Sequence, residues 1–134
     1  MNQLKQGATH TSIFAQATAA QYLKSGRMPA TLDRVRKVYD ERALAMGAAL
    51  LSGAVDFARP QGGLFFWARL TGTRGKTKYA GEVMKKAIGQ GVAFVPGAPF
   101  YESEPAVSTF PLSFATADVG KITEGVQRLK QALA

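Results

Sequence analysis

Apolar and polar residues follow a helical pattern in the first part of the chain. The stretch "SIFAQATAAQYLKSG" (12–26) has no charged residue from Ser12 to Leu23, and several alanines keep it narrow. A helix on a protein surface usually keeps one charged face. We therefore predict a helix that another surface covers on more than one side, with Gly26 and Pro29 as its stop signals.

A second, longer helix is predicted from Thr31, a suitable N-cap residue, to about Leu51. Charged residues lie on one side of it, and Gly53 follows as its end. The apolar residues recur at steps of three and four and form one stripe, which consists of Leu32, Val35, Tyr39, Ala43, Met46 and Leu50.

After this helix the apolar positions change to the period of β-strands. The predicted strands, of which the first two are joined by a "PQGG" turn, are 54–60, 62–70, 92–96 and 108–116. We expect Trp67 in the core beside Phe65 and Phe66. In the last strand the larger apolar side chains share one face, and these are Phe110, Leu112 and Phe114.

Two amphipathic helices complete the pattern. The residues predicted to face inward from the helix 78–91 are Val83, Met84, Ala87 and Ile88. Those predicted to face inward from the C-terminal helix 117–134 are Val119, Ile122, Val126, Leu129 and Leu133.

This order of elements predicts an α+β fold, in which a small mixed β-sheet carries helices on one face and is preceded by two N-terminal helices. We expect an N-terminal helical segment at 1–30. The remaining domain, 31–134, includes the long connecting helix.

Composition excludes several classes of protein. The 134 residues are 46% hydrophobic, which suits one domain with a real core. The formal charge is +8, but basic and acidic residues are mixed outside the loop 71–78, so nucleic-acid binding is not expected. The absence of cysteine and the single histidine, His10, argue against a metal site. The chain has no apolar run of membrane-spanning length and no signal peptide, so we expect no membrane association and a cytoplasmic location.

The segment "VAFVPGAPFYES" (92–103) is unusual, because a predicted strand runs into two prolines, a glycine and two large aromatics. Proline and glycine fix a turn. On the residues alone, the simplest interpretation is that Phe100 and Tyr101 cap the end of the sheet.

Three blocks of sequence resemble a known family in order and spacing. They are "ARPQGGLFFWARL", "GVAFVPGAPFY" and "LSFATADVGKITEGVQRL", and they resemble the C-terminal part of fold-type I pyridoxal-phosphate-dependent aminotransferases. The aminoadipate and kynurenine-type enzymes and the aminotransferase-like domains of MocR-type regulators are the most similar subgroups. The opening "LKQGATHTSIFAQATAAQYLKSG" also resembles the segment that follows the family's active-site lysine.

The resemblance implies a function and a site. In the complete enzyme an amino group would pass between an amino acid and a 2-oxo acid, with pyridoxal phosphate as cofactor. The residues that would border the substrate cleft are Pro96, Gly97, Phe100, Tyr101 and Pro111.

Two departures from the family pattern limit these expectations. The family's lysine lies in a serine–lysine block followed by proline, glycine and arginine, and no lysine of this chain has that setting. We therefore expect no catalytic residue and no cofactor binding in this chain alone, the cofactor-binding large domain being absent. In addition, "TFPLSF" (109–114) has Pro111 where the family pattern "TLRLSF" has the arginine that holds the substrate carboxylate.

Three interpretations stay open. The chain is the C-terminal portion of an aminotransferase, a non-catalytic stand-alone domain that acts by self-association, or part of a MocR-like regulator. We expect the uncharged helix 12–23 to be covered by a second copy in a homodimer, or by a cofactor-binding large domain.

Overall fold

The computed structural model describes residues 12–51, 55–71, 79–103 and 106–134. The chain divides into two compact units, Met1–Lys37 and Val38–Ala134. The basic loop 71–78 and the predicted helix end at Gly53 lie almost wholly outside the described residues. The division into domains 1–30 and 31–134 stays a prediction.

The first unit is helical. Helix α1 (Ile13–Lys24) begins after Ser12, whose hydroxyl accepts a hydrogen bond from the Ala15 N–H at 3.3 Å, and ends before Gly26. Gly26 has a φ of 68°, which glycine adopts without strain and which stops the helix. None of the residues of α1 is buried, and the side chains of Ile13 and Phe14 are 80% and 82% exposed.

Helix α2 (Met28–Leu50) begins earlier than the sequence predicts. Pro29 lies in its first turn, where the missing N–H of proline costs no helical hydrogen bond. Proline therefore follows the end of α1 and opens α2 at the same time. The Tyr22 hydroxyl donates to Thr31 Oγ1 at 2.5 Å, which joins the two helices within this unit.

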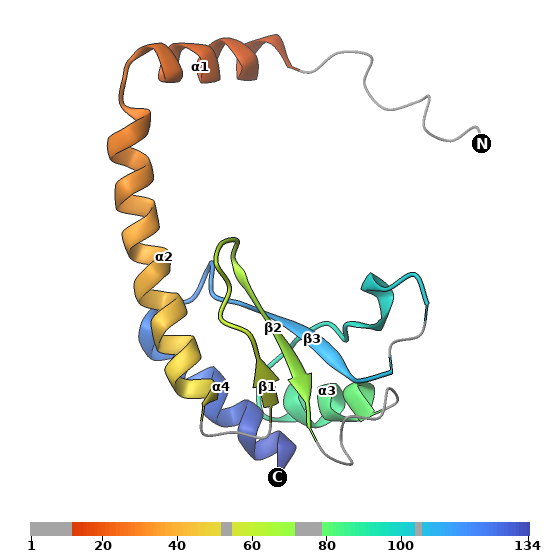
Figure 1. The fold of residues 1–134 in the computed structure, drawn as a ribbon. Helices are drawn as coiled ribbons and strands as arrows, with labels where there is room; N and C mark the ends of the chain where they lie inside the picture. Colours follow the sequence, from red (N-terminus) through yellow and green to blue (C-terminus); the bar gives the residue numbers. More distant parts are fainter. Residues whose placement is uncertain (1–11, 52–54, 72–78, 104–105) are drawn as a thin grey trace, which may run out of the picture. The chain divides into compact units, whose positions relative to one another are not determined.

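The second unit is built on a three-stranded antiparallel sheet with the order β1 (Val55–Phe57), β2 (Phe65–Leu70) and β3 (Thr109–Ser113). Helices α3 (Tyr79–Gly89) and α4 (Val119–Leu133) and the end of α2 pack on one face of it (Figure 1). The predicted α+β class is confirmed.

Strand alternation separates a buried and an open face of this sheet. Phe66, Ala68 and Leu70 of β2 are buried, and Phe110, Leu112 and Phe114 share the buried face as predicted. Trp67 is 39% exposed, so the expectation that it lies in the core is wrong. Trp67 follows Phe66 directly, and neighbouring residues of a strand point to opposite faces.

The helices contribute most of the predicted inward residues. Val83 and Ala87 of α3 are buried, whereas Ile88 is 56% exposed because it lies one step further round the helix. In α4 the predicted stripe is buried except for Val119, which is 45% exposed in the first turn after the N-cap Asp118. The Lys121 N–H donates to the Asp118 carboxylate at 2.8 Å, and this bond lowers the pKa of Asp118.

The segment 92–96 is not a strand, so the described sheet is antiparallel rather than mixed. Directly after this segment, the Gly97 N–H donates to the Thr109 carbonyl of β3 at 2.6 Å. The next β3 residue whose N–H would face that edge is Pro111, which has none. Proline therefore removes a donor that a further strand would need.

Pro111 itself fits β3 because of the register. The Phe114 N–H donates to the Leu64 carbonyl and the Leu70 N–H to the Ser108 carbonyl, so even-numbered residues of the two strands exchange the ladder bonds. Pro111 pairs with Trp67 at a position without such bonds, and its nitrogen faces the edge away from β2. The sheet loses no internal bond to this proline.

The lack of buried side chains in α1 predicts that the first unit opens before the sheet. A short helix without tertiary packing is marginal in water, so we expect the amides of Ile13–Lys24 to exchange with solvent much faster than those of Thr109–Ser113. Hydrogen exchange followed by mass spectrometry at low protein concentration measures both. Equal protection of the two segments would contradict the prediction.

Candidate functional site

A short loop after α3 covers part of the open face of the sheet. It contains the 3₁₀ turn η2 (Ala98–Phe100), and the Phe100 N–H donates to the Gly97 carbonyl at 2.9 Å. The bond from Gly97 to Thr109 anchors the start of this loop to β3. A Cβ added at Gly97 would lie 2.6 Å from the Thr109 carbonyl oxygen, so only glycine fits here.

The aromatic side chains of the loop are held by the open face. The Tyr101 hydroxyl accepts hydrogen bonds from Trp67 Nε1 at 3.0 Å and from Thr109 Oγ1 at 3.3 Å. The ring of Phe100 meets that of Trp67 edge to face, with 5.7 Å between ring centroids. These contacts attach Tyr101 to β2 and β3, and Phe100 to β2, on the open face of the sheet.

A groove of about 380 Å³ lies beside Trp67 and Tyr101 on this face. Apolar surface makes up most of it, with hydroxyl and charged groups at some positions. The residues that line it are Asp56, Phe57, Ala58, Trp67, Arg69, Tyr101, Val107 and Thr109. Of the predicted cleft residues, Tyr101 lines this groove, Gly97 and Phe100 support it, and their role in a substrate cleft stays a prediction.

An ion pair lies at one side of the groove. Arg69 of β2 and Asp56 of β1 are cross-strand partners, and the Arg69 guanidinium donates to the Asp56 carboxylate. This hydrogen bond, together with the positive charge, holds the pKa of Asp56 below its ordinary value. The sequence reasoning did not single out these two residues. The alternation along β2 would have placed Arg69 on the face of Trp67.

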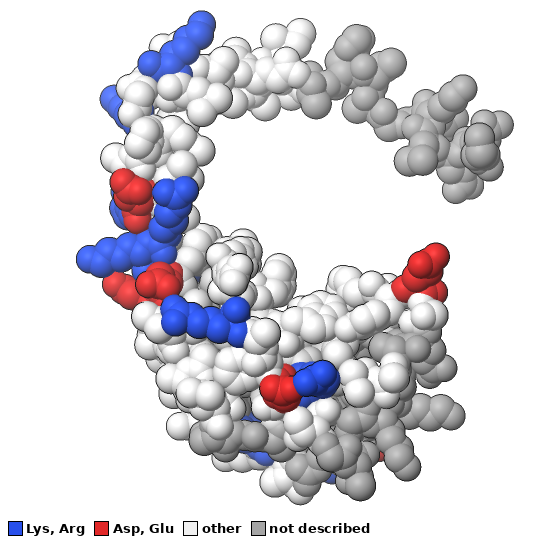
Figure 2. Space-filling view, viewed as in Figure 1, with Lys and Arg blue, Asp and Glu red and all other residues white. Residues whose placement is uncertain are grey.

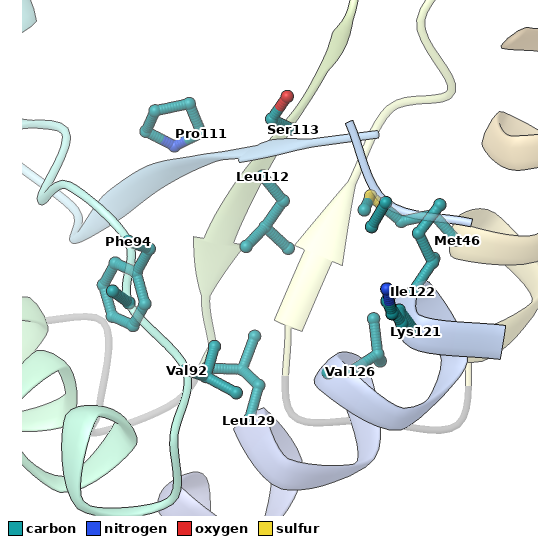
Figure 3. A pocket seen from close by; sticks show the side chains of 13 residues that line it. Met46, Val92, Phe94, Pro111, Leu112, Ser113, Lys121, Ile122, Val126 and Leu129 are labelled. Carbon is teal, nitrogen blue, oxygen red and sulfur yellow. The ribbon is translucent and has the colours of Figure 1, made fainter. Parts of the chain in front are cut away.

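Pro111 lies on the open side of β3, and Figure 3 shows its ring and Ser113 on one side of the strand with Leu112 on the other. Leu112 points toward an apolar cavity of about 210 Å³ between the segment after α3 and α4. Side chains of Val92, Phe94 and Leu129 surround that cavity (Figure 3). Its lining is mainly apolar and includes Pro111, with Ser113 and Lys121 as the polar residues.

The lysines that the structure describes lie outside the groove. None of the residues lining the groove is a lysine, and the described lysines lie on helices. Among the described residues no group of three histidine, cysteine or acidic side chains could hold a metal ion. The helices within the described ranges include none that is long and apolar enough to cross a membrane.

Charges are interleaved on the face shown in Figure 2, where acidic and basic side chains alternate along α2. Asp33 pairs with Arg36 at 3.6 Å, and Asp40 with Arg59 at 3.4 Å. Such exposed pairs contribute little to stability, but they break up the positive field of the chain. Among the described residues of this face, basic side chains therefore lie beside acidic ones.

Known proteins resemble the chain over nearly its whole length. A 2-aminoadipate transaminase from Thermus thermophilus is 42% identical over 135 residues, which are 98% of this chain and 33% of that protein. The crystal structure of LysN, an α-aminoadipate aminotransferase from the same organism, matches 98% of the chain and 33% of its own length with a TM-score of 0.82 and 40% identity. That structure is a complex with N-(5'-phosphopyridoxyl)-L-leucine.

A kynurenine aminotransferase from Pyrococcus horikoshii matches 90% of this chain and 30% of its own length, with a TM-score of 0.80 and 32% identity. No model of a known protein family matches the chain. The chain spans about a third of the length of these relatives.

Sequence and fold agree on the class. The chain corresponds to the C-terminal part of a fold-type I aminotransferase, so the resemblance read from its sequence is confirmed.

The close approach at Gly97 yields a test of the loop. We expect Gly97→Ala to destabilise the chain by about 1–3 kcal/mol, because the added methyl group overlaps the backbone of Thr109. Denaturant unfolding followed by the fluorescence of Trp67 measures the change. The matched control is Gly125→Ala in α4, where an added Cβ meets nothing within 4 Å and helix propensity improves. Equal stability of the two variants would contradict this account of the loop.

Proposed function

We propose that this chain supplies the cleft-bordering portion of an aminotransferase, an enzyme that transfers an amino group between an amino acid and a 2-oxo acid. The observation that carries the proposal is the 42% identity to a 2-aminoadipate transaminase over 98% of the chain. The similarity includes the loop and strands that build the open face. The chain's part in the reaction is to present that face, with Trp67 and Tyr101, to the substrate.

Pyridoxal phosphate is the cofactor that the proposal requires, and when bound it withdraws electrons from the amino acid. The groove that the described residues form contains no lysine that could hold it as a Schiff base. We therefore assign the cofactor to a large domain of the complete enzyme. The role of this chain is then to hold the substrate and to exclude water from the cleft. A cytoplasmic location accompanies this proposal.

A chimera tests this function. In it, the 134-residue chain replaces the matched third of the Thermus thermophilus transaminase. Transfer of the amino group from several amino acids to 2-oxoglutarate is measured as the glutamate that forms. We expect measurable transfer, because the fold that borders the cleft is retained. The 134-residue chain alone, mixed with pyridoxal phosphate and the same substrates, should give none.

A second chimera with Pro111→Arg serves as the control. If the chimera with Pro111 binds the cofactor but transfers no amino group, while the Pro111→Arg chimera is active, the aminotransferase function of this chain is refuted. The non-catalytic interpretation would then replace it.

Self-association is a second proposal, and the exposure of α1 supports it. Ile13, Phe14 and Leu23 of this helix are 80%, 82% and 60% exposed, and no residue from 12 to 23 is charged. Apolar patches of this kind are unusual on soluble monomers. We propose that a second copy covers the helix in a two-fold dimer, or that the large domain covers it in the complete enzyme.

The double substitution Ala17→Glu and Ala20→Glu tests the dimer. It places charge on α1 while keeping a good helix former, so we expect the dimer of the wild-type chain to become a monomer. Sedimentation velocity measures the masses. The control, Gln127→Glu and Gln131→Glu on the exposed side of α4, adds the same charge and should stay dimeric. A monomeric wild-type chain, or a dimeric double variant of α1, would refute the proposal.

A further inference from the structure

Two hydrogen-bond donors point to a ligand in the groove on the open face. The Arg69 guanidinium has five N–H groups in a planar fork, and it donates one hydrogen bond to the Asp56 carboxylate. The Tyr101 oxygen accepts from Trp67 and from Thr109. With Trp67 Nε1 and Thr109 Oγ1 both donating to this oxygen, the tyrosine hydroxyl can offer its own proton to a further acceptor.

The rest of the groove is apolar. Phe57, Val107 and the ring of Trp67 form its walls, and its volume of about 380 Å³ suits a small molecule. A ligand that satisfies both parts carries an anionic oxygen pair at one end and an apolar chain at the other. A carboxylate matches the fork of an arginine with two parallel hydrogen bonds, which a spherical anion does not.

The ion pair with Asp56 leaves Arg69 available to such a ligand. The two side chains are 53% and 50% exposed, and pairs of this exposure contribute little to stability. A ligand carboxylate can therefore share the Arg69 guanidinium with Asp56, or replace Asp56 as the acceptor of its hydrogen bond. If the ligand also carries an ammonium group, the freed Asp56 carboxylate receives it, so both an amino acid and a 2-oxo acid fit the same groove.

The position of Arg69 complements that of Pro111. Trp67 pairs with Pro111 across the two strands, and Arg69 lies two residues further along β2 on the same face. Diagonal neighbours of this kind lie about 7–8 Å apart, within reach of a long side chain. Among the residues that line the groove, Arg69 is the one cation.

We propose that Arg69, together with the hydroxyl of Tyr101, binds the carboxylate of a small amino acid or 2-oxo acid with an apolar side chain. Arg69 would thus serve on β2 the carboxylate-binding role that a proline on β3 cannot perform. The identity of the ligand rests on the proposed aminotransferase function, whereas the site itself rests on the groove and its donors.

The chain carries its own reporter for this site. Trp67 is the single tryptophan, and its indole N–H bonds to Tyr101 at the groove. Titration of the full chain with 4-methyl-2-oxopentanoate, without cofactor, should give a saturable change in the fluorescence of Trp67 and in the NMR shift of its indole N–H. L-Leucine should do the same, and the neutral ketone 4-methylpentan-2-one should not.

Variants separate Arg69 from the general charge of the chain. We expect Arg69→Gln to weaken binding of the oxo acid at least about tenfold and Tyr101→Phe to weaken it several-fold, through lost hydrogen bonds to a charged group. The matched control is Arg59→Gln, because Arg59 is also exposed and paired with an aspartate but lies outside this groove. It should bind as the wild type does. Thermal melts confirm that each variant is folded.

Three results would overturn the proposal: no saturable binding by the wild-type chain, equal affinity of a folded Arg69→Gln variant, or equal losses in the Arg69 and Arg59 variants. If Arg69→Gln does not fold, Arg69→Lys is used instead, because lysine keeps the positive charge but lacks the planar fork of the guanidinium. Wild-type affinity of the Arg69→Lys variant for the oxo acid would then contradict the proposal. Oxo-acid binding by the chain, together with a Pro111 chimera that binds the cofactor but is inactive and an active Pro111→Arg chimera, would refute the proposed function and leave the site intact. An active Pro111 chimera together with no oxo-acid binding by the 134-residue chain would refute the site and leave the proposed function intact.

Discussion

The alternation of side chains along β2 is the constraint on which both the core and the candidate site depend. Phe66, Ala68 and Leu70 point to the helices and are buried to within 2% exposure. The residues between them, including Trp67 and Arg69, point to the open face. A shift of the register by one residue would exchange these sets, which would bury a guanidinium and expose the core. The hydrophobic face therefore determines where the polar groups of the groove lie.

Pro111 determines what can pair with the edge of β3 that faces away from β2. It fits β3 because the register leaves it without a ladder bond to β2, but it offers no donor to the segment 92–96. That segment is attached to the edge of β3 through Gly97 instead, and the loop after it turns onto the open face. Pro111 lies across from Trp67, its cross-strand partner on β2. Proline carries no charge, so the proposed recognition of a carboxylate by this face depends on Arg69.

The two units differ in how they are stabilised. The second unit has a core to which the sheet, α3, α4 and the end of α2 contribute, and Arg42 of α2 donates to the Ala115 carbonyl at 2.5 Å. The first unit has no buried residue in α1 and relies on local hydrogen bonds such as that between Tyr22 and Thr31. A helix of this composition gains most of its stability from the surface that covers it. The uncharged sequence of α1 that leaves this unit without a core is also the basis of the proposal that another surface covers it.

Much of this protein could be predicted from its sequence, because hydrophobic periodicity is a local property. The helices, three of the four predicted strands, the shared face of Phe110, Leu112 and Phe114, and the relationship to aminotransferases all followed from residue order. The exposure of Trp67 could not be predicted in this way, because it depends on which face of the sheet the helices cover. The absence of a strand at 92–96 could not either, because it depends on a proline in a strand that lies further along the chain. The pairing of Asp56 with Arg69 and the contacts from Tyr101 to Trp67 and Thr109 arise across strands and loops far apart in the chain. Only the tertiary structure brings these groups together, because strand register and loop packing are set by long-range contacts that local sequence patterns do not encode.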